Sequence, residues 1–124
     1  MQGFRVLVVE DDFVLNLSLS EFLRDCGFSV ESVYCAAAAF EVIERGHQLS
    51  GLVTDIELGP GPDGFAVARQ ARARYPDVPV VFVSGAGKPR HDREGVAGSA
   101  FFDKPAQPRH ILEMLGAMAQ NQAA

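Results

Sequence analysis

The stretch FRVLVVEDD, residues 4–12, decides the fold, because an apolar run stops abruptly at three consecutive acids. A second apolar run ends at Asp55, and a third, beginning at Ala100, leads through Asp103 to Lys104. Apolar strands that each stop at a charged residue predict one pocket at the carboxyl edge of a parallel sheet, where open α/β sheets place their ligands. An acid cluster with a single lysine indicates a metal ion and a phosphoryl group.

The rest of the chain repeats the alternation of an apolar run with a helical pattern about five times. Such alternation predicts βα units on a parallel sheet. We expect an α/β fold, a flavodoxin-like (βα)5 doubly wound sheet with strand order 2-1-3-4-5. The expected strands are 4–9, 28–33, 49–54, 78–83 and 100–103, and the expected helices follow Asp12, span 36–45, begin at an Asp63 cap and begin near Pro108.

The helix after Asp12 is predicted to bury an apolar face. Its apolar residues recur at helical spacing, and Gly27 ends the pattern; they are Leu15, Leu19, Phe22, Leu23 and Cys26. The last residues, 120–124, are expected to be frayed.

The place where a fourth helix is expected is rich in helix breakers. Each glycine costs about 1 kcal/mol relative to alanine inside a helix, and the breakers are Gly85, Gly87, Pro89, Gly95 and Gly98. We therefore predict a short or irregular fourth helix.

Length and composition exclude several classes of protein. With 124 residues, 48% of them hydrophobic, the chain is expected to form one folded domain over 1–124. The net charge of −5 argues against nucleic-acid binding. No apolar run is long enough to span a membrane and the amino terminus lacks the layout of a signal peptide, so we expect a cytoplasmic protein.

The cysteines and histidines show no metal-binding spacing. Cys26 and Cys35 are expected to be reduced, mostly buried thiols. The scattered His47, His91 and His110 are assigned no chemistry.

The charged strand ends suit one chemistry if the first and third strands are neighbours. Asp11 and Asp55 then project from adjacent strand ends, and two like charges about 4 Å apart repel by roughly 1 kcal/mol in water and by more in a partly dry site. A divalent cation removes that repulsion, and carboxylate oxygens favour Mg²⁺. Asp55 would act as a nucleophile that forms an acyl phosphate, while Lys104 and Ser84 offer a charge and a hydroxyl to its oxygens.

Each residue also has a simpler explanation. Acids after a strand often cap the next helix, which explains residues 10–12 alone about as well as metal binding does. Asp55 alone is equally consistent with a turn residue, and Ser84 alone with a strand-end hydroxyl. Pro105 offers a cis peptide that would place Lys104. The specific signal is the set, because each member ends a different strand.

Four segments together carry a family resemblance. They are Val8-Val9-Glu10-Asp11-Asp12, Thr54-Asp55-Ile56-Glu57-Leu58 with Asp63-Gly64, Phe82-Val83-Ser84-Gly85, and Asp103-Lys104-Pro105. Through them the chain resembles the receiver domain of bacterial two-component response regulators over about residues 4–118. The resemblance implies a phosphoacceptor rather than an enzyme acting on a separate substrate, although such a domain catalyses its own phosphotransfer and dephosphorylation.

The resemblance also implies a role for each site residue. Asp55 is the implied phosphoacceptor, and Glu10 and Asp11 are the acidic pair at Mg²⁺, with the Asp55 carboxylate and the backbone carbonyl of Glu57 completing the protein ligands. The remaining implied roles are the switch hydroxyl for Ser84, the phosphate-binding lysine for Lys104, the rotating aromatic for Phe101 and a minor part for Asp12.

The chain departs from the commonest form of this family in several places. The loop 59–64 carries one residue more, as in receivers associated with a subset of proteobacterial hybrid histidine kinases and single-domain regulators. Phe101 has no hydroxyl, so a switch there acts by packing alone. The breakers after Ser84 put the usual signalling face in doubt, and the basic runs 69–74 and 88–93 are expected to be solvated surface.

The expected function is a phosphorylatable switch. The phosphodonor would be a sensor histidine kinase or a histidine phosphotransfer protein. No DNA-binding module follows Ala124 and the charge is negative, so we expect output through an unidentified downstream protein or phosphate relay, without direct DNA or membrane binding.

Several alternatives stay open. A receiver excised from a hybrid histidine kinase would look nearly identical, and a pseudo-receiver that never takes up phosphate is a further alternative. A small aspartyl-phosphate phosphatase of the haloacid-dehalogenase type fits less well, because its Asp-x-Asp lies near the first strand, whereas Asp55-Ile56-Glu57 follows the third. A flavin- or nucleotide-binding module would want a glycine- or hydroxyl-rich first loop.

Overall fold

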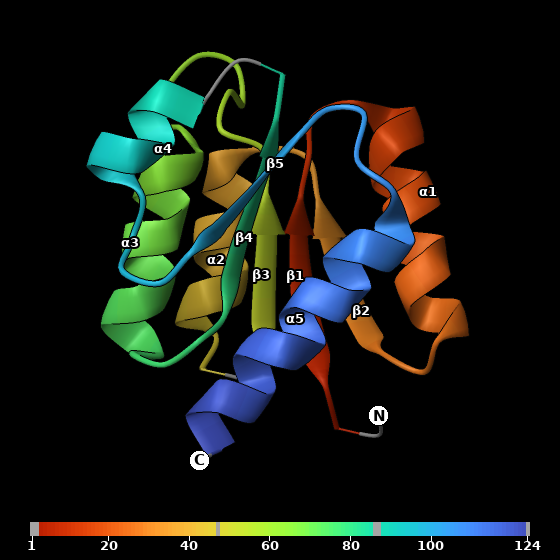
Figure 1. Ribbon diagram of the computed structural model, residues 1–124. Coiled ribbons are helices and arrows are strands. Elements are labelled where there is room, and N and C mark those ends of the chain that lie inside the picture. Colours follow the sequence, from red (N-terminus) through yellow and green to blue (C-terminus); the bar gives the residue numbers. More distant parts are fainter. Residues whose placement is uncertain (1–2, 47, 86–87, 124) are drawn as a thin grey trace.

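The computed structural model describes residues 3–46, 48–85 and 88–123, and its elements follow the predicted alternation (Figure 1). The strands are β1 (Arg5–Val9), β2 (Ser29–Val33), β3 (Gly51–Thr54), β4 (Val80–Ser84) and β5 (Ala100–Asp103). The helices are α1 (Phe13–Asp25), α2 (Ala36–Glu44), α3 (Gly64–Arg74), α4 (Lys88–Glu94) and α5 (Pro108–Ala123). The strands pair in parallel in the order β2-β1-β3-β4-β5, which confirms the predicted fold class. His47 and Gly87 lie outside the described residues.

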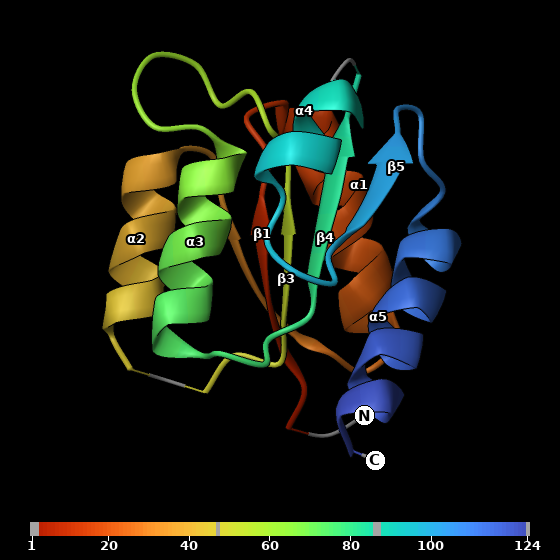
Figure 2. The ribbon, with the colours of Figure 1, turned by 60° about the vertical axis from the view of Figure 1, so that its left-hand side comes forward.

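Helices cover both faces of the sheet, because alternate strand residues point to opposite sides. Helices α2 and α3 lie on one face of the sheet and α1 and α5 on the other (Figure 2). Leu7 and Val9 of β1 belong to the core on the side of α2 and α3, whereas Val6 and Val8 belong to the core on the side of α1 and α5. All four side chains are at most 1% exposed. Fully burying one such aliphatic side chain is worth about 1.5–3 kcal/mol, so both layers hold the sheet firmly.

The carboxyl edge of the sheet brings the charged strand ends into register. Val9 pairs with Thr54, and the ladder continues one residue further, since the Asp55 amide donates to the Val9 carbonyl at 2.9 Å. The ladder between β4 and β5 is extended in the same way, because the Lys104 amide donates to the Ser84 carbonyl at 3.0 Å. The residues that follow β1, β3 and β5 therefore begin from one common edge.

Helix α4 is short, as predicted. It has seven residues and none of them is buried. Helix α5 runs to Ala123, and the fraying expected for residues 120–124 stays a prediction. None of the helices in the described part of the chain is long and apolar enough to cross a membrane.

The predicted buried face of α1 is wrong in detail. Leu23 is fully buried, but Leu15 is 44% exposed, and the other buried residues of the helix are Asn16 and Ser20. Cys26, at the end of α1, is exposed, and Cys35, just before α2, is exposed as well. The expectation of mostly buried thiols is therefore wrong. The polar face turns inward because the Asn16 side chain donates a hydrogen bond to the Glu10 carbonyl beside the acids.

Candidate functional site

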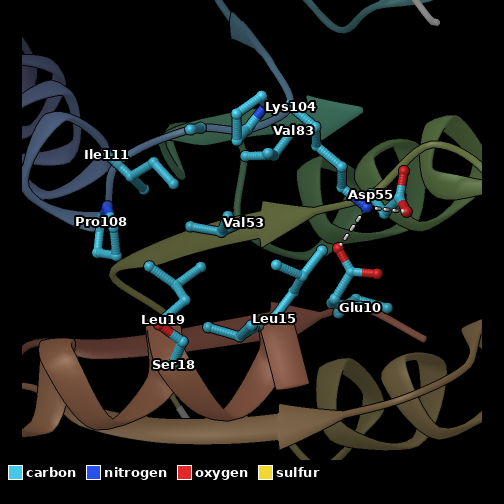
Figure 3. Close-up of a pocket in the computed structure, with 14 residues that line it drawn as sticks. Glu10, Leu15, Ser18, Leu19, Val53, Asp55, Val83, Lys104, Pro108 and Ile111 are labelled. Carbon is cyan, nitrogen blue, oxygen red and sulfur yellow. Dashed lines mark hydrogen bonds and ion pairs between the residues drawn. The ribbon is translucent and has the colours of Figure 1, made fainter. Parts of the chain in front are cut away.

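The site is built around Lys104, which lies between two buried carboxylates. Its Nζ atom is 2.8 Å from Glu10 Oε1 and 2.9 Å from Asp55 Oδ2 (Figure 3). Both acidic residues are 7% exposed. The three residues follow three different strands, so their convergence is a product of the sheet topology. The peptide bond between Lys104 and Pro105 is cis, as predicted.

Asp11 completes an acidic cluster at this place. Carboxylate oxygens of Glu10, Asp11 and Asp55 all lie within 4.8 Å of one another. Asp11 is exposed, so this corner of the cluster is open to solvent. Hard carboxylate oxygens in this arrangement suit Mg²⁺, which keeps several waters when it is bound by a few protein ligands. The donor set therefore fits the predicted metal.

The electrostatics of the pair reflect burial and proximity together. Burial raises the pKa of Glu10 above its ordinary value, although the Lys104 ammonium and the Asp12 amide pull it down. Burial on its own would lower the pKa of Lys104, but the carboxylates of Glu10 and Asp55 outweigh it and the pKa is raised. Lys104 is thus held as a cation, and Glu10 ionises less readily than an exposed glutamate.

Asp12 and Asn16 fix the loop that carries the acids. Asp12 caps α1, because its Oδ1 accepts from the Leu15 amide at 3.0 Å, while its own amide donates to Glu10 Oε2 at 3.0 Å. The side-chain amide of the buried Asn16 donates to the Glu10 carbonyl at 3.0 Å and to the Val33 carbonyl at 2.9 Å. Asn16 is a positioning residue that the sequence interpretation missed; its signal was a polar residue within an apolar helix.

The loop after Asp55 depends on a glycine. The Gly64 amide donates to the Ile56 carbonyl at 2.7 Å, and a Cβ at position 64 would lie 2.0 Å from the Asp55 carbonyl oxygen. Only glycine allows this approach of two backbone segments. Asp63 caps α3 through the Ala66 amide at 3.1 Å, as predicted.

Glu57, Ser84 and Phe101 lie differently with respect to the centre. The Glu57 amide donates to Asp55 Oδ1 at 3.3 Å, so its backbone is tied beside the acid. Ser84 ends β4, is 2% exposed and accepts the Lys104 amide through its carbonyl. Phe101 lies apart from the acids, half-buried on β5 against the core layer of α2 and α3. The roles of these three residues stay predictions.

An apolar cavity of about 310 Å³ opens beside the acid–lysine centre. Leu15 and Leu19 of α1 form one wall, and Ile111 of α5 lies opposite, with Val53 and Val83 of the sheet between them (Figure 3). Large apolar side chains on and beside α1 are exposed, and they are defined here as the α1 surface: Phe13, Val14, Leu15, Leu17 and the neighbouring Tyr34, which are 41–70% exposed. The rings of Phe13 and Tyr34 stack with centroids 6.0 Å apart.

The fold and the site together define a doubly wound α/β domain with a polar centre at the carboxyl edge of its sheet. Residues 6–116 match the family model of the response regulator receiver domain. The chain belongs to this family, and its place is therefore in two-component signalling.

Individual relatives agree with the assignment. The chain is 32% identical over 120 residues to the response regulator protein FleR of Pseudomonas aeruginosa, covering 95% of this chain and 25% of FleR. It spans between a quarter and a half of the curated relatives it matches. A crystal structure of a response regulator receiver protein from Sinorhizobium medicae is 31% identical, with a TM-score of 0.92 and 96% of each chain covered.

The same fold also occurs within a kinase. The receiver domain of the sensor histidine kinase PA1611 of P. aeruginosa has a TM-score of 0.80 and 24% identity, covering 95% of this chain and 98% of that chain. Its structure contains a magnesium ion coordinated in the active-site cleft. At 24% identity this similarity shows a shared fold and nothing further.

Proposed function

We propose that this domain is the phosphoacceptor of a two-component phosphorelay, with Asp55 as the residue that is phosphorylated. The phosphoryl group would come from a phosphohistidine of a sensor histidine kinase or a histidine phosphotransfer protein. In this step the N–P bond of the donor breaks, an O–P bond forms to the Asp55 carboxylate, and the donor histidine keeps its nitrogen electron pair. The observation that carries the proposal is the ion pair of the buried Asp55 with Lys104 inside the acidic cluster.

Each neighbour of Asp55 has a distinct part in the proposal. The Lys104 ammonium lies 2.9 Å from Asp55 Oδ2, and after transfer it would bind a phosphoryl oxygen. The buried Ser84 would offer its hydroxyl to another oxygen. Phe101 would respond by repacking, since it has no hydroxyl of its own to bind.

Mg²⁺ would be held by the carboxylates of Glu10, Asp11 and Asp55 and by the backbone carbonyl of Glu57. When bound there it neutralises charge on the carboxylates and on the phosphoryl oxygens during in-line transfer. The distances within the acidic cluster support the three carboxylates of this ligand set. The presence of Mg²⁺ in the PA1611 receiver is consistent with it, since the two domains share their fold.

The α1 surface supports a protein as the phosphodonor. Four large apolar side chains of α1, and Tyr34 stacked on one of them, are exposed, and exposed apolar patches mark interaction sites. Val14 is 70% exposed and Phe13 61%, and both belong to the first turn after the acids. An apolar helix of the donor would fit this surface and bring its histidine over Asp55. We propose that output also occurs by protein binding.

The proposal is tested by incubating the protein with acetyl phosphate and Mg²⁺ and measuring its intact mass. We expect the gain of one phosphoryl group, which hydroxylamine removes because it cleaves acyl phosphates. Asp55→Asn should lose the gain, because an amide oxygen is a poor nucleophile. Asp77→Asn is the matched control, since Asp77 is an exposed acid in the loop before β4, remote from the cluster.

Either of two results would overturn the assignment. One is phosphorylation that persists in the Asp55→Asn protein, and the other is a product that survives hydroxylamine. The same chemistry would serve a stand-alone regulator and a receiver within a hybrid histidine kinase. The sequence of the full gene product distinguishes these two settings.

A further inference from the structure

Helix α4 is attached to the molecule in an unusual way. Its sequence, Lys88-Pro89-Arg90-His91-Asp92-Arg93-Glu94, contains no large aliphatic or aromatic hydrocarbon side chain. A helix of seven residues is not stable by itself in water, and most helices in proteins are stabilised by packing of an apolar face. Something other than an aliphatic face must therefore hold α4 against the sheet.

His91 supplies one attachment of the helix to the sheet. Its ring lies between Phe82 of β4, with centroids 5.4 Å apart, and Phe101 of β5, with centroids 5.5 Å apart. The His91 side chain is 14% exposed. The ring also determines how the helix ends, because a Cβ at Gly95 would lie 2.6 Å from His91 Cδ2. Gly95 leaves the space that the imidazole needs.

The hydrogen bonds of His91 assign its tautomer. Ser99 Oγ donates its only proton to the Val96 carbonyl at 2.7 Å, so it accepts a hydrogen bond from His91 Nε2 at 2.9 Å. Nε2 therefore carries the proton, and Nδ1 of the neutral ring does not. Nδ1 is buried and has no hydrogen-bond partner among the described residues. A proton added at Nδ1 would lie in this dry position.

The surroundings favour the neutral ring. The side chains that contact it from β4, β5 and the loop after α4 are Phe82, Phe101 and Ser99, which are uncharged. The charged groups near it belong to its own helix: Asp92 Oδ1 is 4.0 Å from Nδ1, but Asp92 is already paired with Lys88. Burial and the Lys88 charge lower the pKa of His91 below its ordinary value.

A second attachment leads from α4 to the loop after Asp55. Arg90 Nη2 lies 2.8 Å from Asp63 Oδ2, and its guanidinium stands 5.0 Å from the centre of the Phe65 ring. The Phe65 and Phe82 rings are in turn 5.0 Å apart. Arg90 thus anchors α4 to the start of α3, whereas His91 joins it to Phe101.

We propose that His91, in its neutral form, is the positioning residue that couples Phe101 to α4. Because the imidazole packs against Phe101, a change in the orientation of Phe101 must displace the imidazole and with it the helix. Protonation of the ring would weaken the same contact without phosphorylation. The first part rests on the proposed function of Asp55 and Phe101; the second does not.

The second part is tested by hydrogen exchange of the α4 amides in the unphosphorylated protein at about pH 7.5 and about pH 5.5, corrected for intrinsic exchange. With an ordinary histidine pKa of about 6.5 in the open state, the opening equilibrium should rise by up to about tenfold at the lower pH. His91→Phe keeps an aromatic ring and removes the titration, so its α4 amides should show no such rise. The α3 amides serve as the internal control. An equal rise in the variant, or none in the wild type, would refute the role of the neutral ring.

The first part is tested with beryllium trifluoride and Mg²⁺, an analogue of the bound phosphoryl group. In the wild type we expect amides 55–57 to shift in NMR spectra and the opening of α4 to change several-fold. His91→Ala should keep the response at 55–57 and lose the response of α4, and His91→Phe should restore it. A helix that responds equally in His91→Ala would exclude the coupling. If amides 55–57 fail to respond in the wild type, the proposed function fails instead, and the pH test still decides the second part.

Discussion

Lys104 is the residue on which the charge balance of the site depends. Its single positive charge pairs with two carboxylates, at 2.8 and 2.9 Å, that are otherwise almost fully buried. Removing one partner from a buried ion pair is strongly destabilising, because it leaves a charge without compensation. A cation bound beside Asp11 would share this compensation, and Lys104 could then move its ammonium to a phosphoryl oxygen. The same lysine thus suits the site both before and after phosphorylation.

The adjacent acids Asp11 and Asp12 are expected to have different roles, Asp11 in binding Mg²⁺ and Asp12 in capping α1. We expect Asp11→Asn to weaken Mg²⁺ binding by at least about tenfold, since changes even to outer-shell partners of metal ligands have effects of that size. Asp12→Ala should leave Mg²⁺ affinity nearly unchanged and lower the free energy of unfolding by about 1 kcal/mol, because it removes the α1 cap. Calorimetric Mg²⁺ titration and urea unfolding of both variants measure the two effects. The reverse pattern would exchange the roles of the two residues.

Gly64 should be the least replaceable glycine of the described chain near the site. Gly64→Ala forces a methyl group to within 2.0 Å of the Asp55 carbonyl oxygen, and overpacking of this kind destabilises by about 1–3 kcal/mol or more. The shift of Asp55 should also slow phosphorylation by acetyl phosphate. Gly116→Ala is the control, because nothing lies within 4 Å of its Cβ position in α5, and alanine should stabilise that helix by up to about 1 kcal/mol. Equal urea midpoints for the two variants would contradict the argument.

At the scale of elements, α1 shows where sequence reasoning succeeds and where it stops. The strand ends were predictable, because each apolar run stops at a charge and parallel strands bring their carboxyl ends to one edge. The rotation of α1 was not. Hydrophobic periodicity favours Leu15 on the inner face, but the buried Glu10 carbonyl after β1 needs a donor, and the Asn16 side-chain amide provides it.

The polar face of α1 should therefore matter more to stability than its exposed leucines. Asn16→Leu leaves the buried Glu10 carbonyl without the side-chain donor, while the Val33 carbonyl keeps the Glu10 amide as a donor, so the free energy of unfolding should fall by about 1–3 kcal/mol. Leu17→Ala, on the 41% exposed side of the same helix, should stay within about 0.5 kcal/mol. Urea unfolding followed by circular dichroism compares them. A larger effect at Leu17 would mean that the helix packs on its other face.

Helix α4 shows a different limit. The glycines on either side of it predicted its shortness correctly, because their backbone penalty is a local property. The packing of His91 against Phe82 and Phe101 was missed, since nothing nearby in sequence indicates it. The basic run 69–74 was likewise expected to be solvated, yet Arg72 donates to the Val78 carbonyl at 2.8 Å and to the Ala97 carbonyl at 2.7 Å. Contacts between distant segments decide both cases.

At the scale of the whole molecule, the acidic cluster gathers three carboxylates at one edge of the sheet beside a single lysine. The β1 and β3 ends place like charges side by side, and the same sheet register that stabilises the core enforces their proximity. Net charge adds to this effect, since the chain carries −5. A ligand that binds only the folded state and neutralises this edge should therefore stabilise the entire domain.

Thermal unfolding with Mg²⁺ tests this expectation. At a concentration one hundred times its Kd, Mg²⁺ should add about 2.7 kcal/mol to the free energy of unfolding, which for a domain of this size raises Tm by about 10 °C.

The gain in Tm from Mg²⁺ should shrink as the pH is lowered. Burial raises the pKa of Glu10, so folding without Mg²⁺ favours the protonated form of this acid. The stability that protonated Glu10 contributes is fully present below the ordinary glutamate pKa and is lost as pH rises through the raised pKa of the folded state. Mg²⁺ binds the ionised form, so its stabilisation should grow across the same pH interval. Glu10→Gln should flatten this part of the pH dependence, and Asp11→Asn should reduce the gain at every pH. A Tm gain that is independent of pH in the wild type, or unchanged in Asp11→Asn, would place the cation elsewhere on the surface.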